Sequence, residues 1–192
     1  VQDAGVIHVL SGNSLGVTPE DDEVWHQNRG RPGVAGEADP QDRFGAALAT
    51  GDLNGDRRAD LIVGVPAEEV EGVRAGAVNV LYGSASGLTD LGNQIWHQGS
   101  AGVHGAPEEE DDFGSALAVG DFDGNGYDDL AVGVPSEYTD PEGQVWQAGA
   151  VNVLYGSAGG LTITGNKVWH QDLPGMEGWG SERFDRFGSA LA

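Results

Sequence analysis

Residues 113–135 read FGSALAVGDFDGNGYDDLAVGVP, and residues 44–66 read FGAALATGDLNGDRRADLIVGVP. In both stretches two short apolar runs flank a polar, glycine-rich loop, and a proline closes the second run. Apolar runs of this length, bounded by turn residues, are typical of buried β-strands. The two stretches therefore predict the same unit, a pair of strands joined by an acidic loop.

This unit is part of a repeat that runs along the whole chain. Three separate markers recur with a period of about 70 residues. They are the FG dipeptides at Phe44, Phe113 and Phe187, the WHQ triplets at Trp25, Trp96 and Trp169, and the GVIHVL or GAVNVLYG runs from Gly5, Gly76 and Gly149. Because the three markers share one period, they indicate a repeat architecture.

Each full unit predicts four short strands. They span residues 44–50, 61–65, 77–82 and about 94–98 in the first unit, and 113–119, 130–134, 150–155 and 167–171 in the second. No segment keeps a 3.6-residue apolar period, so we expect few helices. The middle strands are almost continuously apolar, which favours strands covered on both faces, whereas a two-sheet sandwich would alternate apolar and polar residues. Four-stranded antiparallel sheets in series predict an all-β fold of β-propeller blades.

The repeat divides the chain into four parts. We expect a partial blade (third and fourth strands with a connecting loop) at 1–43, full blades at 44–112 and 113–186, and the first strand of a further blade at 187–192. Closed propellers have about four to eight blades. Roughly three blades' worth of strands predicts an incomplete ring, either a piece of a longer repeat protein or a subunit that assembles with copies of itself.

The two acidic loops have the spacing of a calcium site. Oxygen-bearing side chains occupy positions 1, 3, 5 and 9, and a backbone carbonyl at position 7 would add a ligand, which suits the six to eight oxygens that calcium prefers. The predicted ligands are Asp52, Asn54, Asp56, Arg58 and Asp60 in one loop and Asp121, Asp123, Asn125, Tyr127 and Asp129 in the other. Position 12 is Val63 or Val132, which excludes an EF-hand. We predict two structural Ca2+ sites, and the alternative is an Asx-rich turn without metal.

The order of these motifs resembles a known family. FG, a DxNxDxxxD loop and a strand ending in GVP at Gly64–Pro66 and Gly133–Pro135 are similar to the FG-GAP repeat, with valine in place of the alanine. That repeat builds the seven-bladed propeller at the head of integrin α chains and occurs in many bacterial extracellular proteins. The resemblance covers essentially the whole chain. It implies a calcium-binding β-propeller that is secreted or at the cell surface, and it implies no particular ligand.

Composition narrows the class of partner. The chain has 31 acidic and 9 basic residues, for a net charge of −22, which disfavours nucleic acid and anionic membranes. It has no cysteine, so disulfides and thiolate metal sites are excluded. It also has no apolar run of 18 residues, so we expect no membrane span. An extracellular protein or glycan remains the expected partner.

The variable loops suggest where a partner binds. In a blade, the loops between strands 2 and 3 and those between blades lie on the face opposite the calcium loops. Among the residues that do not repeat, these loops hold Tyr138, Trp146, Met176 and Trp179, which we predict to be the partner-binding surface. The alternative is that these side chains only fill their own loops.

Other chemistry-bearing residues favour a non-enzyme. His26, His97 and His170 recur once per WHQ triplet, which is typical of packing, and the acids from Glu108 to Asp112 are typical of a solvated charge run, although a glycosidase-like pair is left open. The first hypothesis is therefore an extracellular binding or adhesion module. The second is a structural subunit that self-associates head to tail through open blade edges into a ring or filament, and the third is an enzyme domain on a propeller.

Overall fold

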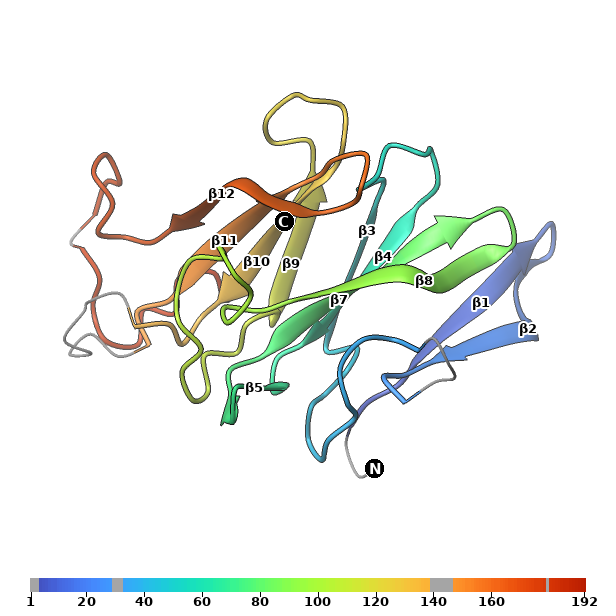
Figure 1. The fold of residues 1–192 in the computed structure, drawn as a ribbon, viewed down its shortest axis with the longest axis horizontal. Coiled ribbons are helices and arrows are strands. Elements are labelled where there is room, and N and C mark those ends of the chain that lie inside the picture. Colours follow the sequence, from blue (N-terminus) through green and yellow to red (C-terminus); the bar gives the residue numbers. More distant parts are fainter. Residues whose placement is uncertain (1–3, 29–32, 139–146, 179) are drawn as a thin grey trace.

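The computed structural model describes residues 4–28, 33–138, 147–178 and 180–192. Two four-stranded antiparallel sheets form its centre (Figure 1). The first blade consists of β3 (Ala47–Gly51), β4 (Asp60–Val65), β7 (Ala77–Ser84) and β8 (Gly87–Trp96). The second blade consists of β9 (Ala116–Gly120), β10 (Asp129–Val134), β11 (Ala150–Tyr155) and β12 (Thr162–Trp169). In each blade neighbouring strands are consecutive, apart from the small hairpin inserted in the first.

Two further pairs of strands accompany the blades. β1 (Ile7–Asn13) and β2 (Gly16–Trp25) form an N-terminal hairpin, and β5 (Glu69–Val70) and β6 (Val73–Arg74) form a short hairpin between β4 and β7. The sheets lie side by side and do not close into a ring (Figure 1). The predicted all-β fold of propeller blades in an incomplete ring is therefore confirmed. None of the described residues forms a helix that is long and apolar enough to cross a membrane.

The middle strands carry the core, as their apolar runs predicted. Every residue of β4 and of β10 is buried, so both faces of each strand are covered. The side chains of Ile62 and Val132, one from each blade, share a single hydrophobic cluster with Phe113. The core therefore lies between neighbouring blades, where each sheet covers the face of the next.

Glycines make this close packing of blades possible. The N–H group of Phe113 donates to the carbonyl of Ala75 at 2.9 Å, and that of Phe187 donates to Ala148 at 2.8 Å. A Cβ on Gly64 would lie 2.1 Å from the carbonyl oxygen of Gly114, and one on Gly133 equally close to that of Gly188. The FG and GVP motifs thus meet between blades, and the second motif needs glycine because a neighbouring backbone occupies the space of a side chain.

Several strand boundaries differ from those expected. β3 and β9 begin three residues after Phe44 and Phe113, because these buried side chains are used in contacts between blades. β8 and β12 begin earlier than expected, since each hairpin starts soon after the turn that follows the third strand. Residues 187–192, expected as a first strand, form no β ladder, because no described strand lies where their partner would be. The β5–β6 hairpin was not predicted.

Candidate metal centres

The loop between β9 and β10, called here the second loop (residues 121–129), brings three carboxylates together. One oxygen from each of Asp121, Asp123 and Asp129 lies within 4.8 Å of the others. Asp129 holds the base of the loop: its Oδ2 accepts from the N–H of Phe122 at 2.7 Å, and its Oδ1 accepts from Gly156 at 2.8 Å. This carboxylate therefore joins the loop to the end of β11.

The rest of the second loop wraps around Asp121. Its Oδ1 accepts from the N–H groups of Gly124 at 2.8 Å and Asn125 at 3.0 Å, and its Oδ2 accepts from Gly126 at 3.0 Å. Both glycines have positive φ angles, 78° and 88°, which L residues adopt only with strain. The donor set is three carboxylates and the Asn125 amide, with no cationic side chain in the loop, so it fits a hard, oxygen-preferring cation such as calcium.

The loop between β3 and β4, the first loop (residues 52–60), follows the same path with different charges. Asp52 accepts from the N–H groups of Asp56 at 3.0 Å and Arg57 at 2.8 Å, and Asp60 accepts from Leu53 and Gly83, both at 2.9 Å. However, Oδ2 of Asp56 pairs with Nη1 of Arg58 at 3.1 Å. In the described part of the chain, the three carboxylates of this loop do not meet as closely as those of the second loop.

The carboxylates at position 9 are the buried members of both loops. Asp60 and Asp129 are fully buried. Burial raises the pKa of each, and hydrogen bonds from two backbone N–H groups lower it in part. A cation placed beside these carboxylates would favour their charged form and oppose the effect of burial. Their environment is thus compatible with a metal ligand.

The two loops also contact each other. The N–H of Asp128 donates to the carbonyl of Asp52 at 3.0 Å, and the N–H of Asp52 donates back to Oδ2 of Asp128 at 2.7 Å. The ring of Tyr127 packs against Gly55, where an added Cβ would lie 2.6 Å from it. Both loops therefore lie at one edge of the blades, shown uppermost in Figure 1.

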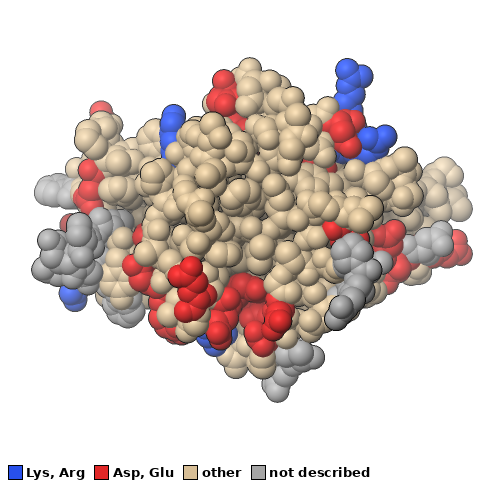
Figure 2. Space-filling model, in the orientation of Figure 1, with Lys and Arg blue, Asp and Glu red and all other residues tan. Residues whose placement is uncertain are grey.

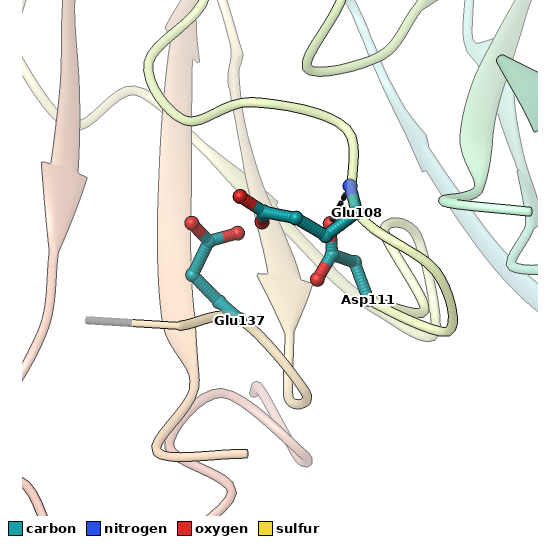
Figure 3. A group of neighbouring side chains, drawn as sticks. All are labelled: Glu108, Asp111 and Glu137. Carbon is teal, nitrogen blue, oxygen red and sulfur yellow. Dashed lines mark hydrogen bonds between the residues drawn. The ribbon is translucent and has the colours of Figure 1, made fainter. Parts of the chain in front are cut away.

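A second group of carboxylates lies where the two blades join. Figure 3 shows Glu108 and Asp111, from the connection between β8 and β9, pointing toward Glu137, which follows β10. Asp111 is 0% exposed and Glu137 9% exposed, and Nε2 of Gln98 donates to Oε2 of Glu137. We call these three acids the second carboxyl cluster. The interpretation of residues 108–112 as a solvated charge run was wrong for Asp111, because the neighbouring blade covers it.

Burial controls the protonation of this cluster. It raises the pKa of Asp111 to about 8, and the charge of Glu137 adds to the effect. It also raises the pKa of Glu137 to about 8, although the hydrogen bond from Gln98 lowers it in part. One oxygen from each of Glu108, Asp111 and Glu137 lies within 4.8 Å of the others. Three ionised carboxylates would repel one another in this buried position, so protons or a cation would stabilise the cluster.

The same arrangement occurs one repeat earlier. Nε2 of Gln27 donates to Oε2 of Glu68 at 2.5 Å, and the N–H of Asp39 donates to Oδ2 of Asp42. Asp39, Asp42 and Glu68 form the first carboxyl cluster. Burial raises the pKa of Glu68 to about 7, and the charge of Arg74 partly opposes the rise of the pKa of Asp42. The sequence contained a signal for both clusters, since the glutamine of WHQ and the glutamate after GVP recur with the blade period.

The opposite edge of the blades carries the variable loops. Of the predicted partner-binding residues, Tyr138 and Met176 are half-buried, and Trp146 and Trp179 lie outside the described residues. A cavity of about 810 Å3 opens between these loops, and Arg43, Arg74, Glu109, Glu110 and Gln147 are among the residues that line it. Figure 2 shows acidic side chains gathered along the lower edge of the molecule, in the orientation of Figure 1. The described loops thus form a polar, hollowed surface.

The histidines of the WHQ triplets take no part in the acidic groups. His26, His97 and His170 are each half-buried, and burial lowers the pKa of His97. No possible metal-binding group within the described residues contains a histidine. Their position agrees with the expectation that they pack within the blades.

Comparisons with known proteins identify the repeat. The FG-GAP repeat model matches residues 44–81 and 113–146. Human phosphatidylinositol-glycan-specific phospholipase D is 36% identical over 143 residues, which is 73% of this chain and 16% of that protein. Integrin alpha-3 of Cricetulus griseus is 35% identical over 143 residues, which is 71% of this chain and 12% of the integrin. Integrin alpha pat-2 of Caenorhabditis briggsae is 37% identical over 142 residues, which is 70% of this chain and 10% of that integrin. The chain thus spans about a sixth or less of these relatives, and it contains two repeats that match the FG-GAP repeat family.

Proposed function

We propose that the chain is a calcium-stabilised extracellular recognition module, which binds a protein or glycan through the face opposite its calcium loops. The observation that carries this proposal is the separation of the two edges of the blades. The acidic loops with metal-type spacing gather at one edge, and the irregular loops with a cavity of about 810 Å3 gather at the other. A rigid sheet scaffold with variable loops is the usual setting for a binding surface.

Calcium would have a structural role in this module. Each acidic loop joins the first two strands of its blade, and its position-9 carboxylate also holds the end of the third strand. A bound cation would cancel the repulsion between the three carboxylates of each loop. We infer two calcium sites, with ligands Asp52, Asn54, Asp56 and Asp60, and Asp121, Asp123, Asn125 and Asp129, together with the carbonyls of Arg58 and Tyr127.

The relatives support a binding role without deciding against catalysis. They include integrin α chains and a phospholipase D, and the matched segment is 10 to 16% of each of the three compared. The charged groups around the cavity are Arg43, Arg74, Glu109, Glu110, Asp112 and Arg186, and Nη2 of Arg43 already pairs with Oδ1 of Asp112 at 2.8 Å. Because these side chains carry charges of both signs, we propose that they form a polar recognition surface.

The test is a screen of extracellular protein and glycan arrays with the 192-residue chain, followed by substitutions. Tyr138→Ala and Met176→Ala should weaken binding of any partner found by at least threefold, because both side chains lie on the variable loops. Leu91→Ala, at an exposed position of β8, is the control and should leave the affinity unchanged. A partner whose affinity falls with Leu91→Ala and not with the loop variants would contradict the proposed face.

A second candidate function is assembly with copies of the chain. Large apolar side chains are exposed on the outermost strands, among them Leu10 and Val17 on the N-terminal hairpin and Ile163 and Trp169 on β12. Such surfaces and open edges favour association with another chain. Light scattering at micromolar concentration distinguishes the candidates: a ring or filament supports assembly, and a monodisperse monomer supports the recognition module alone.

A further inference from the structure

The second carboxyl cluster has more buried acceptors than hydrogen-bond donors. Oδ1 of Asp111 and Oε2 of Glu108 are buried and accept no hydrogen bond within the described structure. The donors closest to the group are already used, since the N–H of Glu108 donates to Oδ2 of Asp111 at 2.7 Å and the Gln98 amide donates to Glu137. A buried oxygen without a partner is costly, so these atoms require a further positive group.

A side chain from the start of the same connection also contacts this cluster. Gln98, which follows β8, is 4% exposed, and its amide reaches the Glu137 carboxylate. Its Oε1 lies on the same amide carbon, is buried, and has no donor among the described residues. An amide oxygen only accepts hydrogen bonds, so it also suits a cation as its neighbour. The cluster thus presents oxygens from four side chains on two connecting segments.

Charge balance separates this cluster from the first one. At the first cluster the charge of Arg74 acts on Asp42. The corresponding residue of the next repeat, directly before its Ala-Gly pair, is the neutral Gln147. The charged group that acts on Glu137 is another acid, Glu108, and residues 139–146 contain no lysine or arginine. The charge of Arg74 thus acts on the first cluster, whereas the corresponding residue of the second repeat is neutral.

The lengths of the side chains separate the two clusters in the same way. Glu108 of the second cluster corresponds to Asp39 of the first, which is shorter by one methylene group. The three carboxylates of the second cluster lie within 4.8 Å of one another, and those of the first do not form such a group within the described structure. Only the second cluster is compact enough for one ion to contact all three acids.

We propose that Glu108, Asp111 and Glu137, with the Gln98 amide oxygen, form a third calcium site, buried between the two blades and separate from both loops. The all-oxygen donor set suits a hard cation, and two positive charges would balance most of the three carboxylates. Such an ion would join the connection after β8 to the segment after β10, and so hold one blade on the next. This inference goes beyond the proposed partner binding and does not depend on it.

The experiment counts calcium ions on the folded chain by equilibrium dialysis at neutral pH, with native mass spectrometry as a second readout. Glu137→Gln should bind one ion fewer than the wild-type chain, because it removes a carboxylate and keeps the shape. Glu108→Asp, which copies Asp39 of the first cluster, should also lose one ion. The matched control is Glu68→Gln in the first cluster, which should bind the same number as wild type.

Two outcomes would overturn the proposal. If wild type, Glu137→Gln and Glu108→Asp bind equal numbers of ions, the carboxyls share protons and hold no metal. If Glu68→Gln loses an ion instead, the ion binds at the first carboxyl cluster and not at the second. Circular dichroism identifies a variant that does not fold, and the conservative Glu108→Asp then decides the result. Asp123→Ala should remove a different ion, so failure of a loop site is distinguishable from failure of this one.

Discussion

The two blades share one backbone pattern and differ in how they neutralise acidic side chains. At position 7 of the calcium-type loop the first blade has Arg58, which pairs with Asp56 at 3.1 Å, and the second blade has Tyr127. At the carboxyl clusters the first blade has Arg74, and the second has Gln147. In both places an arginine stands in one repeat and a neutral residue in the next. We therefore expect cation binding to affect the second blade more than the first.

The largest expected effect is loss of stability when calcium is removed from the second loop. Calcium that binds the folded state alone stabilises it by RT ln(1 + [L]/Kd), about 2.7 kcal/mol at 100 Kd. Asp123→Ala should therefore lower the free energy of unfolding by about 2–3 kcal/mol at saturating calcium. Asp56→Ala should cost less, because Arg58 already neutralises Asp56. Urea unfolding with calcium and with chelator measures the free energy lost in each variant. Equal losses in Asp123→Ala and Asp56→Ala would contradict the expected difference between the two loops.

The next effect concerns pH at the first carboxyl cluster. Burial raises the pKa of Glu68 to about 7, and the acids that act on it are Asp42 and Asp39. The pKa of Glu68 is higher in the folded protein than in the unfolded chain. Its contribution to the free energy of unfolding is therefore fully present below about pH 4.5 and is lost as the pH rises through about 7. Glu68→Gln, which stays neutral, should be about 2 kcal/mol more stable than wild type at pH 8 and equal at pH 4.

The control for this pH dependence is Glu69→Gln, the exposed neighbouring acid on β5. It should leave the free energy of unfolding unchanged at both pH values. Thermal unfolding at fixed calcium compares the three chains. A Glu68→Gln variant that is less stable than wild type at pH 8 would show that the charged carboxylate is needed there.

A smaller effect tests the charge difference at the second cluster. Gln147→Arg would introduce a cation at the repeat position of Arg74. It should weaken calcium binding at the proposed inter-blade site about tenfold, or about 1.4 kcal/mol, since a positive charge beside the site opposes the binding of a cation. Calorimetric calcium titration of this variant and of Gln147→Met separates the effect of charge from that of side-chain shape. Equal affinities in the two variants would count against the proposed compensation by arginine.

The smallest effect is expected at the first loop. Arg58→Ala removes the pair with Asp56, which lies at the surface and contributes about 0.2–1 kcal/mol. The freed carboxylate should bind calcium a few-fold more tightly, because its competing partner is gone. A calcium titration measures the change, and Arg183→Ala, outside both loops, is the control. A lower affinity in Arg58→Ala would indicate that the arginine supports the site.

Much of the fold was predictable because it depends on local patterns. The apolar runs of β4 and β10, the acidic loops and the repeat period are all short-range features, and they placed β4 and β10 to within one residue. The short β5–β6 hairpin was missed, because two-residue strands leave no apolar period. The length of β8 was underestimated, since its residues are mixed in polarity and depend on pairing with β7 for their structure.

What the sequence alone determined was the repeat, the all-β blades and two loops with calcium-type spacing, because each of these is encoded by residues close together in the chain. The tertiary structure alone showed that the acids of the carboxyl clusters meet and are buried. Gln98 and Asp111 lie on the β8–β9 connection and Glu137 follows β10, so the three come together only in the folded chain. A run of acids looks solvated in the sequence because burial is a property of the neighbouring sheet, and that sheet covers Asp111 while leaving Glu109 and Glu110 exposed.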